Sequence, residues 1–107
     1  MGDRGQVLIE DSGVYLYTHY GASELVDDVR RALAKKWRWD DPEYLTRIIL
    51  DEMIGTGEFR SETGYGIHTI QHGDIWRLIK ISCEHQRVTI EDDRRKSAIK
   101  SFTEFIE

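Results

Sequence analysis

The stretch SELVDDVRRALAKKWRWDDPEYLTRIILDEMIG, residues 23–55, decides the predicted fold, because its apolar residues recur at the spacing of two successive helices. The first helix is expected over residues 24–37, with Ser23 as its N-cap. The second is expected to follow one of the aspartates at 40 and 41, with Pro42 in its first turn, and to end at a glycine, 55 or 57. The apolar stripes expected to be buried are Leu25, Val26, Val29, Ala32, Leu33 and Trp37 in the first helix and Tyr44, Leu45, Ile48, Ile49 and Met53 in the second.

Segments of alternating polar and apolar residues on both sides of this stretch predict strands. The five expected strands cover residues 6–10, 14–20, 65–71, 75–83 and 87–91. A last helix is expected after Asp92 or Asp93. Its apolar stripe, which either covers the sheet or contacts a partner, is Ile99, Phe102, Phe105 and Ile106. The chain is thus predicted to be one α+β domain, residues 1–107, in the order ββααβββα, with a mostly antiparallel five-stranded sheet and its helices on one face.

Composition limits the classes of function. The chain has 107 residues, of which 39% are hydrophobic and 33% charged, as is ordinary for a globular domain. The sequence has no apolar run long enough to span a bilayer and no signal-peptide pattern, so we expect a cytoplasmic protein without membrane contact. The net charge of −5 argues against a nucleic-acid partner. Cys83, the single cysteine, excludes an internal disulfide and is expected to be half-buried at the end of a strand.

The first candidate binding segment is the run of Tyr15, Tyr17 and His19, which ends at Gly21. Alternation along a strand places the three rings on one face, and the glycine lets a ligand or another backbone come close. Stacked rings beside a turn are typical of a platform for a flat ligand. The competing interpretation is favoured: the rings only pack under the helices or cover an open sheet face, because aromatic residues are common in strands whatever the function.

The second candidate segment is Trp37-Arg38-Trp39-Asp40-Asp41, in the expected turn between the helices. Trp37 and Trp39 are too close in sequence to share one helix face, and Arg38 between them is suited to hold an anion or to stack on a ring. The competing interpretation is a turn pinned by one buried indole, with the aspartates as helix caps.

The third candidate segment is Glu62-Thr63-Gly64-Tyr65-Gly66. Two glycines around a tyrosine allow backbone amides to face an anion or a carbonyl group. The segment matches no phosphate-binding loop, and a strand entrance with a glycine bulge is the competing interpretation.

Metal binding and catalysis find less support in the sequence. His68 and His72, with Asp74 near them, carry ligand atoms, but residues four apart in a strand are separated by roughly 13 Å, too far to share one ion unless the turn folds back. We therefore expect no metal and no cofactor. The serines lack a nucleophile-elbow motif, Cys83 has no evident base, and helix starts explain the paired aspartates. No catalytic residue is assigned, and binding is favoured over an enzymatic role.

Three motifs follow one another along the chain: YLYxHxG at residues 15–21, RWDDxxYLxRII at 38–49 and ETG[YF]GI at 62–67. In these motifs the chain resembles a family of small uncharacterised proteins of phage, prophage and bacterial genomes. The family brings no established activity, so the resemblance implies a context rather than a mechanism. Small phage proteins often act by binding, either by sequestering a signalling nucleotide of host immunity or by masking a host protein.

The sequence thus predicts a non-enzymatic binding protein of phage or prophage type whose ligand is small, anionic and nucleotide-like. If the three segments converge, one pocket is expected to hold the ligand. The residues expected to bind it are Tyr15, Tyr17, His19, Gly21, Arg38, Trp39, Arg47, Glu62, Thr63, Gly64, Tyr65 and Gly66. The alternative is a protein–protein module or homo-oligomer that modulates a host protein through the apolar stripe of the last helix.

Overall fold

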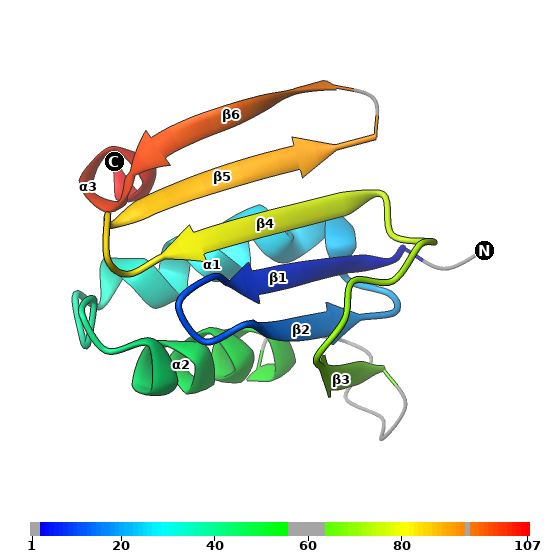
Figure 1. Ribbon diagram of the computed structural model, residues 1–107, viewed down its shortest axis with the longest axis horizontal. Helices are drawn as coiled ribbons and strands as arrows, with labels where there is room; N and C mark the ends of the chain where they lie inside the picture. The colour runs from blue at the N-terminus through cyan, green and yellow to red at the C-terminus, as the bar shows by residue number, and fades with distance from the viewer. Residues whose placement is uncertain (1–2, 56–63, 94) are drawn as a thin grey trace.

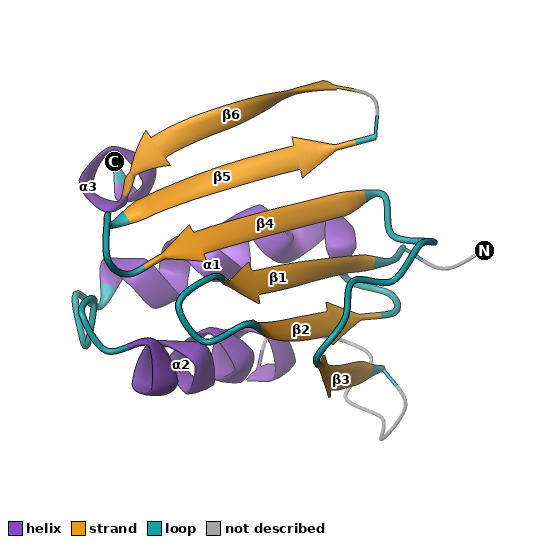
Figure 2. Ribbon diagram, in the orientation of Figure 1, coloured by secondary structure: helices purple, strands orange, loops and turns teal. Residues whose placement is uncertain are grey.

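The computed structural model describes residues 3–55, 64–93 and 95–107. Within them lie a mixed six-stranded sheet and three α-helices, so the fold is α+β (Figure 2). The strands are β1 (Gly5–Ile9), β2 (Val14–Thr18), β3 (Tyr65–His68), β4 (Arg77–Ser82), β5 (Arg87–Asp92) and β6 (Arg95–Ser101). The helices are α1 (Leu25–Ala34), α2 (Pro42–Gly55) and α3 (Phe102–Ile106), with a short 3₁₀ helix, η1 (Ala22–Glu24), before α1.

The sheet has the strand order β3-β2-β1-β4-β5-β6 and is antiparallel except at its centre. There β1 and β4, which lie far apart in the sequence, pair in parallel, with Val7 opposite Ile79 and Ile9 opposite Ile81. The β1–β2 turn was predicted correctly: the N–H of Gly13 donates to the carbonyl of Ile9 at 2.9 Å. Its φ of 74° suits glycine. The sheet is thus two hairpins joined through one parallel pair, with a further strand at each edge.

The C-terminal part differs from the prediction. A sixth strand, β6, pairs antiparallel with β5 in the region where the last helix was expected. Only the end of that region is helical, as the five residues of α3. Ile99, which was assigned to the buried helix stripe, lies on β6 and is 63% exposed. Helix α3 begins with a capping box, in which Ser101 Oγ accepts a hydrogen bond from the N–H of Glu104 at 3.1 Å. Pairing with β5 therefore overrides the helical spacing of the apolar residues.

The two central helices were predicted correctly, except at the ends of α1. Ser23 is not the N-cap, because it lies within η1, where its N–H donates to Asp3 Oδ2 at 2.8 Å. Helix α1 ends at Ala34 rather than at residue 37, so Trp37 does not belong to its buried stripe. Helix α2 begins and ends within the predicted bounds.

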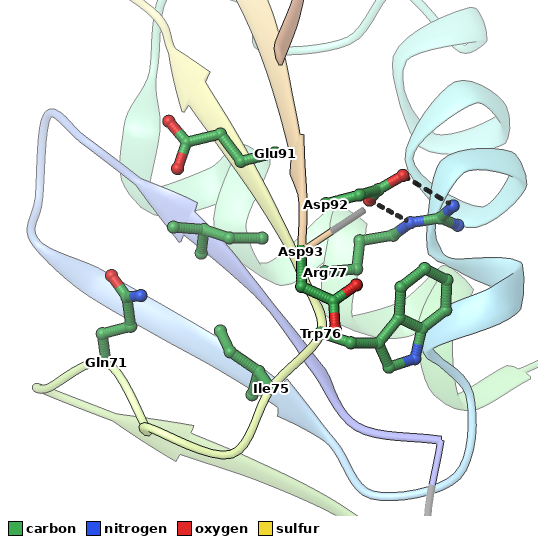
Figure 3. A pocket seen from close by; sticks show the side chains of 8 residues that line it. Gln71, Ile75, Trp76, Arg77, Glu91, Asp92 and Asp93 are labelled. Atoms are coloured by element: carbon green, nitrogen blue, oxygen red, sulfur yellow. Dashed lines mark hydrogen bonds and ion pairs between the residues drawn. The ribbon is translucent and has the colours of Figure 1, made fainter. Parts of the chain in front are cut away.

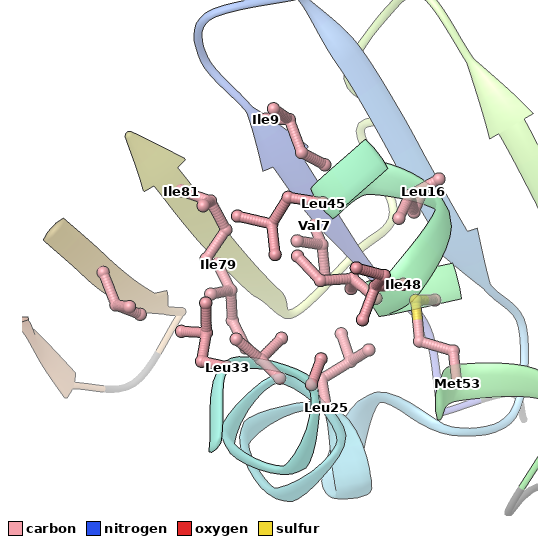
Figure 4. Packing of buried hydrophobic residues seen from close by; sticks show 14 of the residues in the cluster. Val7, Ile9, Leu16, Leu25, Leu33, Leu45, Ile48, Met53, Ile79 and Ile81 are labelled. Carbon is pink, nitrogen blue, oxygen red and sulfur yellow. The ribbon is translucent and has the colours of Figure 1, made fainter. Parts of the chain in front are cut away.

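The hydrophobic core fills the space between the helices and one face of the sheet (Figure 4). In Figure 1, α1 and α2 lie behind the strands. The fully buried aliphatic side chains that meet there include Val7, Ile9, Leu16, Leu25, Leu33, Leu45, Ile49, Ile79 and Ile81. None of the described helices covers the opposite face of the sheet. Side chains on the strands can therefore be sorted into a helix-covered face and an uncovered face.

Candidate functional site

The predicted binding segments do not form one pocket within the described residues. On β2, Leu16 is fully buried under the helices, so its neighbours Tyr15 and Tyr17 point to the uncovered face. Arg38 precedes α2 and Arg47 lies on it, in the layer of helices behind the sheet. The tyrosines and the arginines are therefore separated by the sheet.

The first and third segments do come together, at the edge of the sheet. Strand β3 pairs with β2, with Gly66 opposite Tyr17, and the N–H of His19 donates to the carbonyl of Gly64 at 3.0 Å. The N–H of Gly21 donates to a threonine hydroxyl at the end of β2, which closes the turn there. Glu62 and Thr63 lie outside the described residues.

A pocket of about 440 Å³ lies beside the turn between α1 and α2. Two aromatic rings, two guanidinium groups and one aliphatic side chain line it: Trp37, Arg38, Tyr44, Arg47 and Ile48. Trp37 is 59% exposed and Tyr44 is 51% exposed, which is unusual for rings of this size. We call this cavity the turn pocket.

The turn between α1 and α2 has an unusual backbone conformation. Lys36 and Arg38 both have a φ of 59°, in the left-handed region that residues with side chains seldom adopt. The Nε1–H of Trp39 donates to the carbonyl of Leu33 at 3.0 Å, and that carbonyl also accepts from the N–H of Lys36. The Trp39 ring packs edge-on against Phe102 at a centroid distance of 5.3 Å. Trp39 is thus the indole that pins the turn.

Trp37 does not lie where it was predicted, whereas Trp39 matches the competing interpretation of an indole that pins the turn. Trp37 was assigned to the buried stripe of the first helix but lines the turn pocket, and Trp39 was assigned to ligand binding but does not line it. Tyr44 was likewise expected to be buried. The cap prediction is confirmed, because Asp41 Oδ1 accepts a hydrogen bond from the N–H of Tyr44 at 3.3 Å. The sequence signal that was available is the spacing of Trp37 and Trp39, which rules out a common helix face.

The turn pocket is cationic and aromatic, with carboxylates at its rim. The guanidinium carbon of Arg38 lies 4.4 Å from the centroid of the Tyr44 ring, and Arg38 Nη1 is 3.9 Å from Asp41 Oδ2. Arg47 Nη1 lies 2.6 Å from Asp51 Oδ2. The side chains of both ion pairs are 32% to 65% exposed to solvent, and exposed pairs contribute little to stability. An anionic ligand can therefore compete with these aspartates for the guanidinium groups.

A second, smaller pocket of about 200 Å³ lies where β4 begins and β5 ends (Figure 3). Three of its charged groups, Arg77, Asp92 and Glu91, already have ion-pair partners. Arg77 Nε donates to Asp92 Oδ1 at 3.0 Å, and both side chains are nearly buried. Glu91 on its far side is paired with Lys80, at 2.7 Å. These ion pairs fasten β4 to β5, and a structural role accounts for them.

Cys83 follows β4 and is more buried than predicted, with 5% exposure. Burial, together with the nearby carboxylate of Asp11, raises the pKa of its thiol to about 12. The thiol is therefore protonated at neutral pH, whereas a nucleophilic cysteine requires a thiolate.

Comparisons with family models, with curated proteins and with solved structures found no match to this chain. Within the described residues, no helix combines the length and the apolar character that crossing a membrane requires.

Proposed function

We propose that this protein binds a small anionic ligand with a flat ring, of the nucleotide type, in the turn pocket. The observation that supports the proposal best is the composition of the pocket: two half-exposed rings and two arginines around a cavity of about 440 Å³. This volume lies in the range of roughly 300–1,000 Å³ that is usual for small-molecule sites.

The chemistry of the lining fits the two parts of a nucleotide. A base gains stacking energy on an indole or phenol ring, and this attraction does not depend on which base is present. A planar guanidinium can make paired hydrogen bonds to a phosphate, which a lysine cannot. We assign ring stacking to Trp37 and Tyr44 and phosphate contacts to Arg38 and Arg47. Sequestration of a host signalling nucleotide, in the manner of small phage proteins, requires no more than such binding.

The test is a thermal-shift panel of cyclic nucleotides, linear nucleotides and ADP-ribose derivatives, followed by titration of any compound that raises the melting temperature. Arg47→Gln should weaken binding by roughly tenfold to a hundredfold, because a hydrogen bond to a charged group contributes about 1.5–3 kcal/mol. Arg87→Gln is the matched control, since Arg87 is an exposed arginine on β5, away from the pocket.

Ligand carried through purification gives a second readout. Native mass spectrometry of protein purified from cells should show an added mass that Arg47→Gln reduces and Arg87→Gln does not. The proposal is wrong if the panel gives no shift and no ligand co-purifies, or if both variants lose binding equally.

The alternative, a module for protein–protein contact, was predicted from the apolar stripe of the last helix. Phe102 and Phe105 of the last helix are buried within their own chain, against α1. Three isoleucines of the described residues are exposed. Ile67 on β3 and Ile70 just after it belong to one edge of the sheet, and Ile99 on β6 belongs to the other, so these side chains form no patch that spans the sheet. Light scattering that showed a stable dimer would revive the alternative.

A further inference from the structure

Two histidines meet at the β3 edge of the sheet, on the face that the helices leave uncovered. Strand β3 ends at His68, and the chain then turns back, so that His72 lies beside it with ring centroids 4.4 Å apart. The Nδ1 atom of His68 and the Nε2 atom of His72 are hydrogen-bonded to each other at 2.5 Å, a contact that a bound ion would replace. Because β3 ends at His68 and does not continue to residue 71, the separation of roughly 13 Å expected for the two histidines does not occur.

A buried glutamine fixes the loop that brings His72 back. Gln6 on β1 is fully buried, and its Nε2 donates to the carbonyl of Ile70 at 3.2 Å. Its Oε1 accepts from the N–H of His72 at 2.9 Å. One side chain therefore satisfies two backbone groups of the loop, and the position of His72 is set by the sheet itself.

The orientation of the His68 ring depends on Gly66. A Cβ atom at residue 66 would lie 2.8 Å from His68 Nε2, a separation that real Cβ atoms do not adopt. The ring thus folds over the glycine, with Nε2 against the strand and Nδ1 toward His72. The Tyr17 ring stacks on His68 at 5.1 Å and 14° and lies 5.0 Å from His72. This packing accounts for a glycine opposite Tyr17 in the third motif.

The hydroxyl of Tyr17 is directed away from the histidine pair. Tyr17 hydrogen-bonds His19 Nδ1 through its hydroxyl at 2.9 Å. Its ring therefore forms a wall beside the pair, while its hydroxyl is engaged by His19.

We propose that His68 Nδ1 and His72 Nε2 together bind one divalent metal ion of the kind that prefers imidazole ligands, such as Zn²⁺. Imidazole ligands suit Zn²⁺, Cu²⁺ and Ni²⁺, whereas Mg²⁺ and Ca²⁺ require oxygen ligands. Two nitrogens on a tetrahedral Zn²⁺ lie roughly 3.3 Å apart, so the rings need to separate by less than about 1 Å. No group of three His, Cys, Asp or Glu side chains in the described residues is placed to hold an ion. Water fills the remaining positions in this proposal, and the site is open and exchangeable.

The test is a calorimetric titration of tag-free protein with ZnCl₂ near neutral pH, with MgCl₂ in parallel. We expect one Zn²⁺ per chain and no heat with Mg²⁺. His68→Gln and His72→Gln should each lower the affinity by at least about tenfold, since losing even an outer-shell partner can have this effect. His85→Gln is the matched control: His85 lies between β4 and β5, and its side chain is 56% exposed.

Two further measurements separate ligand loss from a failure to fold. In histidine ring spectra of the unaltered protein, Zn²⁺ should shift the signals of His68 and His72 and leave those of His85 in place. Gly66→Ala keeps both ligands but displaces the His68 ring, so it should weaken Zn²⁺ binding as well. The proposal is overturned if Zn²⁺ does not bind, if it shifts only other histidines, if one ion bridges two chains, or if both glutamine variants bind like the unaltered protein.

Discussion

The edge-on contact between Trp39 and Phe102 should couple the turn between α1 and α2 to the C-terminal helix. Phe102 is fully buried, with 0% of its surface exposed. The centroid of its ring lies 5.3 Å from that of the Trp39 ring, and the two ring planes make an angle of 75°. An aromatic pair in this geometry is worth about 0.5–1.5 kcal/mol beyond the area it buries. We therefore expect a coupling free energy of about that size between Trp39→Leu and Phe102→Leu in a double-mutant cycle.

The assay is urea unfolding followed by far-ultraviolet circular dichroism, on the four proteins of the cycle. Trp39→Leu also removes the hydrogen bond to the carbonyl of Leu33, but this loss occurs with and without Phe102 and cancels in the cycle. Tyr15→Leu combined with Phe102→Leu is the control, since Tyr15 faces the other side of the sheet, and the pair should be additive to within about 0.5 kcal/mol. A coupling of Trp39 with Phe102 no larger than this control would refute the reasoning.

Three other predictions test the packing and the titrating groups. Gly5→Ala should destabilise the protein by about 1–3 kcal/mol in thermal unfolding, because the new Cβ atom would lie 2.8 Å from the Cβ atom of Ala22. Gly55→Ala should be neutral or stabilising in the same assay, because a Cβ atom there meets nothing within 4 Å. Burial alone would raise the pKa of Asp11, but two backbone N–H groups donate to it and hold its pKa below the ordinary 3.8. The ionised Asp11 therefore contributes its full stabilisation above the unfolded-state pKa of 3.8, and this stabilisation is lost as the pH falls through the lower pKa of the folded state. Asp11→Asn should therefore make the free energy of unfolding fall less steeply at acid pH. Cys83 should react with iodoacetamide only after denaturation, and prompt labelling of the folded protein would contradict its burial.

The helices were predictable because their signals are local. Pro42 and the aspartates before it define the start of α2 within a few residues, and the apolar spacing that follows needs no partner to be recognised. The end of α1 was not predictable in this way. Lys36 and Arg38 adopt left-handed conformations that the residue types there do not predict. The helix therefore ends at Ala34, and Trp37 lies outside it.

The sheet was predictable only in part, because strand partners are not written in local patterns. Alternation identified β1 to β5, although β3 ends at His68 rather than at residue 71. The parallel pairing of Val7 with Ile79 was not predictable in this way, because it joins residues far apart in the sequence. The residues of β6 are mostly polar, and the apolar spacing from Ile99 to Phe105 resembles a helix until β5 supplies a hydrogen-bonding neighbour. The candidate site was also predictable only in part. Its segments were recognised, but which of them meet depends on the face that each strand presents.

The arrangement of the two proposed sites bears on whether this chain does chemistry on a phosphate. Metal-assisted phosphoryl transfer places the ion on the phosphate oxygens, where it neutralises the developing charge. Here His68 lies on the uncovered face, beside β2, whereas Arg38 and Arg47 lie in the helix layer, so the sheet separates the imidazole pair from the turn pocket. An ion on the histidines cannot reach a phosphate held by the arginines. A nucleotide in the turn pocket would therefore be held rather than hydrolysed with help from that ion, and binding of the two should be independent.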